Sequence, residues 1–92
     1  MTSFDETLAA DARFAQGFEF QVSDPKEAIA SYQKALILYE ALAKADPTTV
    51  PEYQSKLANT HYNMGILFRA TGRTEEAKVS FQDAEAIRAK IR

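Results

Sequence analysis

Apolar residues recur three or four positions apart along four stretches of the chain, and residues that favour turns separate these stretches. This spacing places the apolar residues on one face of an α-helix. Pro25 and Pro51 stand where new stretches begin and Gly72 where the third one stops, as helix starts and ends prefer. The pattern predicts an all-α chain of four helices over about residues 4–22, 25–45, 50–71 and 74–91, with short connections that favour antiparallel neighbours. The predicted faces are Ala28, Tyr32, Ala35, Tyr39 and Leu42 in the second helix, Tyr53, Leu57, His61, Met64 and Phe68 in the third, and Ala77, Phe81, Ala84, Ile87 and Ile91 in the fourth.

The first predicted helix has two apolar surfaces. The residues of one face recur at three, four or seven positions, and they are Phe4, Leu8, Ala12, Ala15 and Val22. A second surface is formed by Phe14, Phe18 and Phe20, so the apolar area is wider than one partner helix requires. Gly17 inside this helix costs about 1 kcal/mol relative to alanine. Its missing side chain would let a neighbouring helix approach closely.

Composition narrows the possible function classes. The chain has 92 residues, a net charge of −2 and no cysteine, so we expect one small domain without disulfides or thiolate metal sites. No apolar run approaches the roughly 20 residues that span a bilayer, and the acidic start does not have the pattern of a signal peptide. Residues 1–50 contain eight acidic and four basic residues, whereas single-stranded nucleic acid needs a positive groove. We therefore expect a cytoplasmic protein that binds neither nucleic acid nor a membrane.

Residues 61–91 carry a characteristic order of small and large side chains. The order is His61-x2-Met64-Gly65-x2-Phe68, then Ala77-x3-Phe81, with Ala84 at the next small position. It resembles the tetratricopeptide repeat, whose signature is W-x2-L-G-x2-Y followed by A-x3-F. The resemblance implies antiparallel helix pairs that stack into a right-handed superhelix and bind other proteins.

A looser copy of this order lies upstream, as Gln16-Gly17-x2-Phe20, then Ala28-x3-Tyr32, with Ala35. The chain thus resembles a single domain, residues 1–92, of two repeats: a degenerate one over about 4–46 and a clearer one over about 50–91. Ala28 and Ala77 are 49 positions apart, whereas a standard repeat has about 34 residues. An extended variant with longer second and third helices would account for the difference. The alternative is a plain four-helix bundle whose alanines and aromatic residues only form the core.

The family resemblance implies a concave surface lined by the first helix of each pair. Its positions fall on Asp11, Phe14, Phe18 and Gln21 in the first copy and on Asn59, Tyr62, Asn63, Ile66 and Arg69 in the second. An apolar centre with amide and charged edges suits an extended peptide or a partner helix. Family members that bind chaperone C-termini place a lysine and a further asparagine near the position of Asn63. Tyr62 and Ile66 stand there instead, so we do not expect that partner.

Self-association is a second expectation. The fourth helix shows apolar residues on more than one face, namely Val79, Ala86, Ile87 and Ile91. Repeat arrays usually need about three repeats and a polar capping helix, and no such helix follows in this sequence. Residues 1–50 have a net charge of −4 and residues 51–92 of +2, which favours antiparallel or head-to-tail pairing. We therefore expect a homodimer or a higher homo-oligomer, in which Phe14 and Phe18 are buried against a sister subunit or bind a foreign peptide.

Candidate chemistry is sparse. His61 is the only histidine, and neither Leu57 nor Gly65, four positions away, could ligate a metal with it. In the repeat register it takes a place often held by tryptophan, so we expect it to pack between helices. The sequence has no phosphate loop, nucleophile motif or cofactor fingerprint. We predict a non-catalytic protein-interaction module without a cofactor or metal. The alternative from another class is a helical bundle that holds a small ligand or a metal.

Overall fold

The chain forms four α-helices, as the hydrophobic pattern predicts, in a computed structural model that describes residues 3–45, 48 and 50–90. Helix α1 covers Ser3–Phe20, α2 covers Pro25–Ala45, α3 covers Val50–Ala70 and α4 covers Thr74–Lys90. The described residues contain no strand, so the fold is all-α over this part of the chain. No helix in the described ranges combines the length and the apolar character that a membrane span needs.

The connection from α1 to α2 begins earlier than the pattern predicts. α1 ends at Phe20, and Val22, predicted to be helical, lies in the turn with 89% of its surface exposed. The Asp24 carboxylate accepts a hydrogen bond of 3.2 Å from the amide of Glu27, which makes Asp24 the N-cap of α2 with Pro25 at its first position. The helix prediction to residue 22 is wrong because the chain must reverse direction before this cap.

The connection from α3 to α4 is closed by Gly72, as predicted. Its φ of 81° lies in the left-handed region, where only glycine is free of steric cost. The amide of Gly72 donates to the carbonyl of Arg69 at 3.2 Å, and the amide of Arg73 donates to that of Phe68 at 2.7 Å. These two bonds form a Schellman motif, which satisfies carbonyls at the end of α3.

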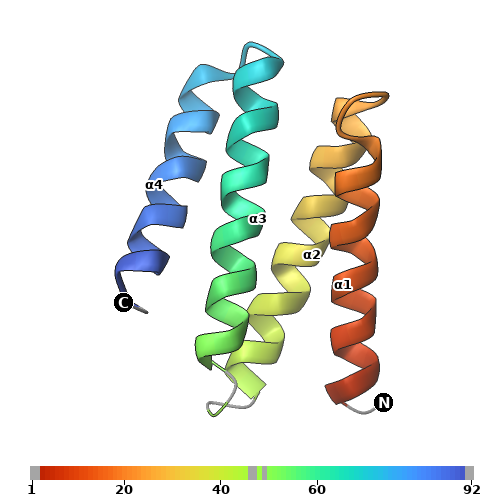
Figure 1. The fold of residues 1–92 in the computed structure, drawn as a ribbon, viewed down its shortest axis with the longest axis vertical. Helices are drawn as coiled ribbons and strands as arrows, with labels where there is room; N and C mark the ends of the chain where they lie inside the picture. Colours follow the sequence, from red (N-terminus) through yellow and green to blue (C-terminus); the bar gives the residue numbers. More distant parts are fainter. Residues whose placement is uncertain (1–2, 46–47, 49, 91–92) are drawn as a thin grey trace.

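The helices are arranged as two antiparallel pairs side by side. α1 packs on α2, α3 packs on α4, and the pairs meet where α2 contacts α3 (Figure 1). α1 and α3 run in the same direction on one side of the molecule, and α2 passes behind them. α2 is thus contacted from two sides, by α1 and by α3. The described residues form a slab that measures 37 × 28 × 14 Å.

The core consists largely of the predicted faces of α2, α3 and α4. It forms two clusters, one around Tyr32 and Phe68 and the other around Tyr39 and Leu57. Burying a large apolar side chain stabilises the fold by roughly 1.5–3 kcal/mol. These two clusters therefore hold the helix pairs together, and they confirm the helical periodicity as the guide to the core of these three helices. Ile91 of the predicted α4 face lies outside the described residues.

α1 is the exception. The face on which its apolar residues recur at three, four or seven positions points into solvent. Ala10 and Gly17 are buried against α2, and Phe14 is half-buried between the two core clusters. Spacing alone did not reveal this face, since close approach to α2 depends on small residues. The exposed members of the other face are Leu8, Ala12, Ala15 and Val22.

The two pairs share a glycine–aromatic contact at matching positions. An added Cβ at Gly17 would lie 2.6 Å from the ring of Tyr32, and one at Gly65 would lie 2.7 Å from the ring of Phe81. The two glycines are 48 positions apart and the two aromatic residues 49 apart. A shift of 48 therefore relates α1 to α3, and a shift of 49 relates α2 to α4.

The same shifts reproduce an aromatic pair. The ring of Phe14 meets that of Tyr32 at a centroid distance of 5.2 Å and an angle of 61°. Tyr62 meets Phe81 at 5.5 Å and 60°. The internal repetition seen loosely in the sequence thus corresponds to repeated contacts between helices.

Candidate protein-binding surface

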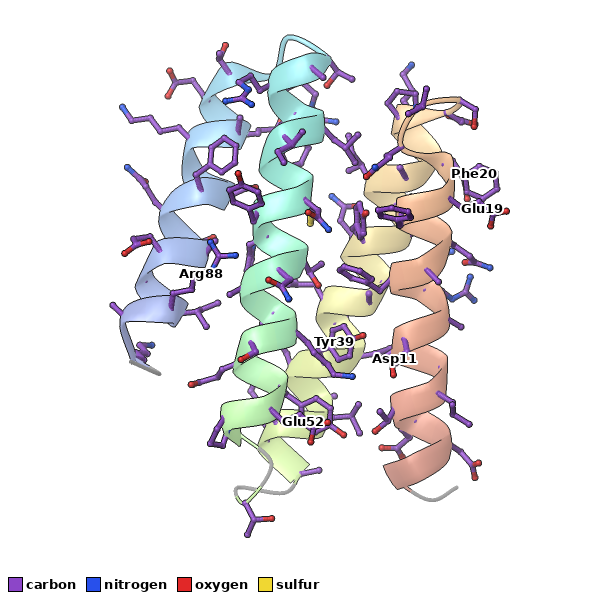
Figure 2. All side chains as sticks on the ribbon, in the orientation of Figure 1. Asp11, Glu19, Phe20, Tyr39, Glu52 and Arg88 are labelled. Atoms are coloured by element: carbon purple, nitrogen blue, oxygen red, sulfur yellow. The ribbon has the colours of Figure 1, made fainter. Side chains whose placement is uncertain are left out.

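A polar junction ties three helices together. Asp11 on α1 accepts hydrogen bonds from the Tyr39 hydroxyl on α2 and, at 3.0 Å, from Nζ of Lys56 on α3. Figure 2 shows Asp11 and Tyr39 facing each other between α1 and α2. One turn nearer the start of α1, the hydroxyls of Thr7 and Tyr53 are 2.6 Å apart. These contacts set the position of α1 relative to α3.

The junction is electrostatically matched. Burial opposes the charged form of Asp11, but hydrogen bonds from Tyr39 and Lys56 and the positive charge of Lys56 outweigh it and lower the pKa of the carboxyl. Burial is also the largest cause that raises the pKa of the Tyr39 phenol, and the neighbouring Asp11 adds to it. The carboxylate is therefore ionised and the phenol neutral at pH 7.

A hollow of about 180 Å³ lies at this junction, between α1 and α3, and is called the lower hollow below. Three polar groups of the junction line it, and they already pair with one another. A ligand entering here would compete with those bonds. The residues lining this lower hollow are Asp11, Phe14, Tyr39, Lys56 and Asn59.

A second hollow, of about 270 Å³, lies farther along the same two helices. Phe18 and Val22 expose 63% and 89% of their surface, and Ile66 on α3 exposes 37%. The Gln21 amide oxygen accepts a hydrogen bond of 3.3 Å from the buried Tyr32 hydroxyl at its edge. This upper hollow presents apolar surface with amides beside it. Its lining residues are Phe18, Gln21, Val22, Asn63, Ile66, Leu67 and Ala70.

A third hollow, of about 350 Å³, lies between α3 and α4. The guanidinium of Arg88 is 5.2 Å from the centroid of the Tyr62 ring, and that of Arg69 is 5.5 Å from that of Phe81. Arg88 also donates to the amide oxygen of Asn59 at 3.3 Å. Arginine stacked on an aromatic ring keeps its charge and its remaining donors available to a partner. The lining residues are Tyr62, Arg69, Phe81, Ala84, Glu85 and Arg88.

The nine residues predicted to line one groove are distributed over these three hollows. Those of α1 and one side of α3 come together, whereas two residues on the other side of α3 face α4. The lower hollow contains Asp11, Phe14 and Asn59, the upper one Phe18, Gln21, Asn63 and Ile66, and the third Tyr62 and Arg69.

The residues predicted for self-association are spread over α4. Val79 is exposed beside Phe68 at the start of α4, Ala86 is exposed, and Ile87 is half-buried against the core. Ile91 lies outside the described residues. Of the α4 residues that face the third hollow, Phe81 and Ala84 were predicted only as packing positions, and Glu85 and Arg88 were not predicted at all. The spacing of three and four positions that joins these residues was the available signal.

His61 lies between helices, where the sequence reasoning placed it. Its Nδ1 is 3.9 Å from Oδ2 of Asp83 on α4, and only 15% of its side chain is exposed. Burial lowers the pKa of the imidazole, and the charges of Asp83 and of Glu40 on α2 partly oppose this effect. The described residues contain no group of three or more His, Cys, Asp or Glu arranged to hold a metal ion.

Comparison with protein-family models, with curated proteins and with solved structures found no match to this chain.

Proposed function

We propose that this chain is a non-catalytic protein-interaction module, an extended two-repeat member of the tetratricopeptide type, that binds an extended peptide or a partner helix. The upper hollow between α1 and α3 receives apolar side chains of the partner. The two helix pairs stack with the right-handed sense of that family, and the parallel α1 and α3 form the binding side.

The observation that carries this proposal is the exposed apolar surface of the upper hollow. Phe18 on α1, Val22 in the turn after it and Ile66 on α3 line the same hollow and remain exposed. Apolar residues scattered singly are ordinary, whereas a group of them around a hollow is typical of an interaction site. The amides of Gln21 and Asn63 at its edge can orient a peptide backbone.

The repeated contacts support the repeat type over a plain bundle. In a bundle, glycine and its aromatic partner would have no reason to recur in both pairs with the same ring geometry. Here Gly17 and Gly65 each lie under a ring that is itself contacted by a second ring from the same first helix. Each pair is thus built to one plan, as stacked repeats are.

The test is to select peptides on the wild-type chain and then measure their affinity for two variants. Phe18→Asp and Ile66→Asp place a charge in the upper hollow, and we expect each to weaken binding by at least about tenfold, as removal of a hot-spot contact does. Ile37→Asp is the control, because Ile37 is as exposed as Phe18 but lies on α2 and does not line this hollow. Far-UV circular dichroism checks that all three variants keep the fold.

A selection that yields no specific peptide would contradict the proposal. Peptides that bind the two hollow variants as tightly as the wild type would contradict it as well.

A further inference from the structure

The hollow between α3 and α4 is the counterpart of a surface that is covered in the first helix pair. There, α3 packs over α2, and Phe14, Tyr32 and Tyr39 lie in the clusters that it covers. The residue 48 positions after Phe14 is Tyr62, and the residues 49 positions after Tyr32 and Tyr39 are Phe81 and Arg88. All three of these counterparts line the third hollow. The α3–α4 surface thus has the form of a helix-docking face, and no described helix covers it.

A polar contact supports this equivalence. In the first pair, the Tyr39 hydroxyl donates to Asp11. At the shifted positions, Arg88 donates to Asn59 at 3.3 Å. The hydrogen bond is kept, but its anionic acceptor has become a neutral amide and its neutral donor a cation. The open face is therefore positive where the covered one is negative.

α1 has a complementary opening. The α3 residues that pack toward the first pair include Tyr53, Leu57 and Leu67, and all three are buried. A shift of 48 places their counterparts at Asp5, Ala9 and Glu19 of α1, and all three of these are exposed. The same exposed side of α1 carries the apolar residues of its regular face, which are Leu8, Ala12 and Ala15.

We propose that α1 of a second copy docks on the α3–α4 face, in the way that α3 covers the α1–α2 face within one chain. The contact is head-to-tail: each molecule offers its α3–α4 face to one neighbour and its α1 to another. Such heterologous contacts extend into chains or close into rings. This interface is centred on the third hollow, whereas the proposed function rests on the upper hollow. By the same shifts, Phe18 and Ile66 of the upper hollow lie at the edge of the interface.

Opposite charges favour α1 of a second copy as the occupant of the α3–α4 face. Gln21 and Leu67 both line the upper hollow. Arg69 is the counterpart of Gln21 on α3, and Glu19 is the counterpart of Leu67 on α1. Arg69 would therefore lie near Glu19 of the docked copy. Tyr39 contacts Tyr53 at a ring distance of 6.1 Å, so Arg88 would lie near Asp5. Both pairs are of opposite charge, in line with the acidic first half and the basic second half of the sequence. Figure 2 shows Arg88 on the α3–α4 side and Glu19 on the opposite outer edge of α1.

Two substitutions block the two contacting surfaces separately, one on α1 and the other on the α3–α4 face. Ala12→Arg changes an exposed residue whose counterpart, Thr60, is completely buried, so an arginine there has no room in the interface. Arg69→Glu places like charges together at the other end. Light scattering coupled to size exclusion should show a mass that rises with wild-type concentration, falls with salt, and stays at one 10.3 kDa chain for either variant.

Mixing the two blocked variants is the sharper measurement. The intact α1 of the Arg69→Glu chain can dock on the intact face of the Ala12→Arg chain, and both outer ends are then blocked. We expect a heterodimer of twice 10.3 kDa that grows no further. Copies of the double variant Glu19→Arg/Arg69→Glu should associate with one another again, because this variant exchanges the two charges.

A wild-type chain that stays monomeric at every concentration would overturn the proposal, as would an association that survives both substitutions. A symmetric dimer would overturn the proposal too, because it joins the same surface of both copies, whereas the proposed contact joins two different surfaces. Peptide binding measured on the Ala12→Arg variant tests the upper hollow independently of this interface, because that hollow is untouched.

Discussion

The backbone of Gly17 lies directly under the ring of Tyr32, so close that an added Cβ would come within 2.6 Å of two ring carbons. Tyr32 has no exposed surface, and its hydroxyl is bonded to Gln21. The ring therefore has no room to retreat. Gly65 lies in the same way under Phe81, but that ring is half-buried at the edge of an open hollow.

We predict that Gly17→Ala destabilises the fold more than Gly65→Ala. Alanine gains about 1 kcal/mol of helix propensity at either site, while overpacking costs typically 1–3 kcal/mol. Gly17→Ala should lower the free energy of unfolding by roughly 1–2 kcal/mol, and Gly65→Ala should be close to neutral because Phe81 can move toward the hollow. Urea denaturation measures both. An equal or larger loss at Gly65 would show that Phe81 is as confined as Tyr32.

The Asp11 junction predicts acid sensitivity. Since the fold lowers the pKa of this carboxyl, the unfolded chain binds the proton first as pH falls. The stabilisation is complete above the ordinary aspartate pKa of about 3.9 and is lost as pH falls through the lower value of the folded state. Asp11→Asn should therefore cost about 1 kcal/mol at pH 7, less than a fully buried charged hydrogen bond because solvent screens a side chain that is 43% exposed. This cost should shrink as the pH falls below the ordinary aspartate pKa.

The matched variant is Lys56→Met, which removes the cationic partner of the same junction and keeps its aliphatic stem. The double variant with Asp11→Asn should cost less than the two single variants added together, because they share one interaction. Additive costs, or a cost for Asp11→Asn that persists unchanged in acid, would contradict a role for the ionised carboxylate.

His61 predicts a second pH effect near neutrality. Burial lowers its pKa in the fold, so the unfolded chain takes up this proton first as pH falls. The free energy of unfolding should therefore be unaffected above the ordinary pKa of about 6.5 and decline below it. Urea denaturation between pH 5 and 8 should show this decline, and His61→Gln should abolish it. Asp83→Asn should make the decline steeper, because it removes a charge that favours the imidazolium.

Three of the four helices could be read almost completely from the sequence. The predicted faces of α2 and α3 are buried or nearly so, and Pro25 begins α2 and Gly72 closes α3 as their positions suggested. α1 could not be read in this way, because it is apolar on two sides. Its buried side is marked by Ala10 and Gly17, and small residues give periodicity analysis almost no signal.

The structure brings some of the predicted groove residues together and separates others. The register of the repeat pointed to Phe18, Asn63 and Ile66, and these do share one hollow. It pointed equally to Tyr62 and Arg69, which turn toward α4 instead. Residues one or three positions apart on a helix differ by about 100° or 60° in direction, so the partner helix decides which surface each side chain joins.

The sequence by itself determined the number of helices, most of their ends and the core faces of α2 and α3, because these depend on local spacing and capping. Only the tertiary structure decided which side of α1 is buried, and only it joined Asp11, Tyr39 and Lys56 into one junction. It also left the arginine-bearing α3–α4 face open. These outcomes depend on contacts between helices far apart in the chain, where the fit of a glycine under a ring outweighs the pattern along any single helix.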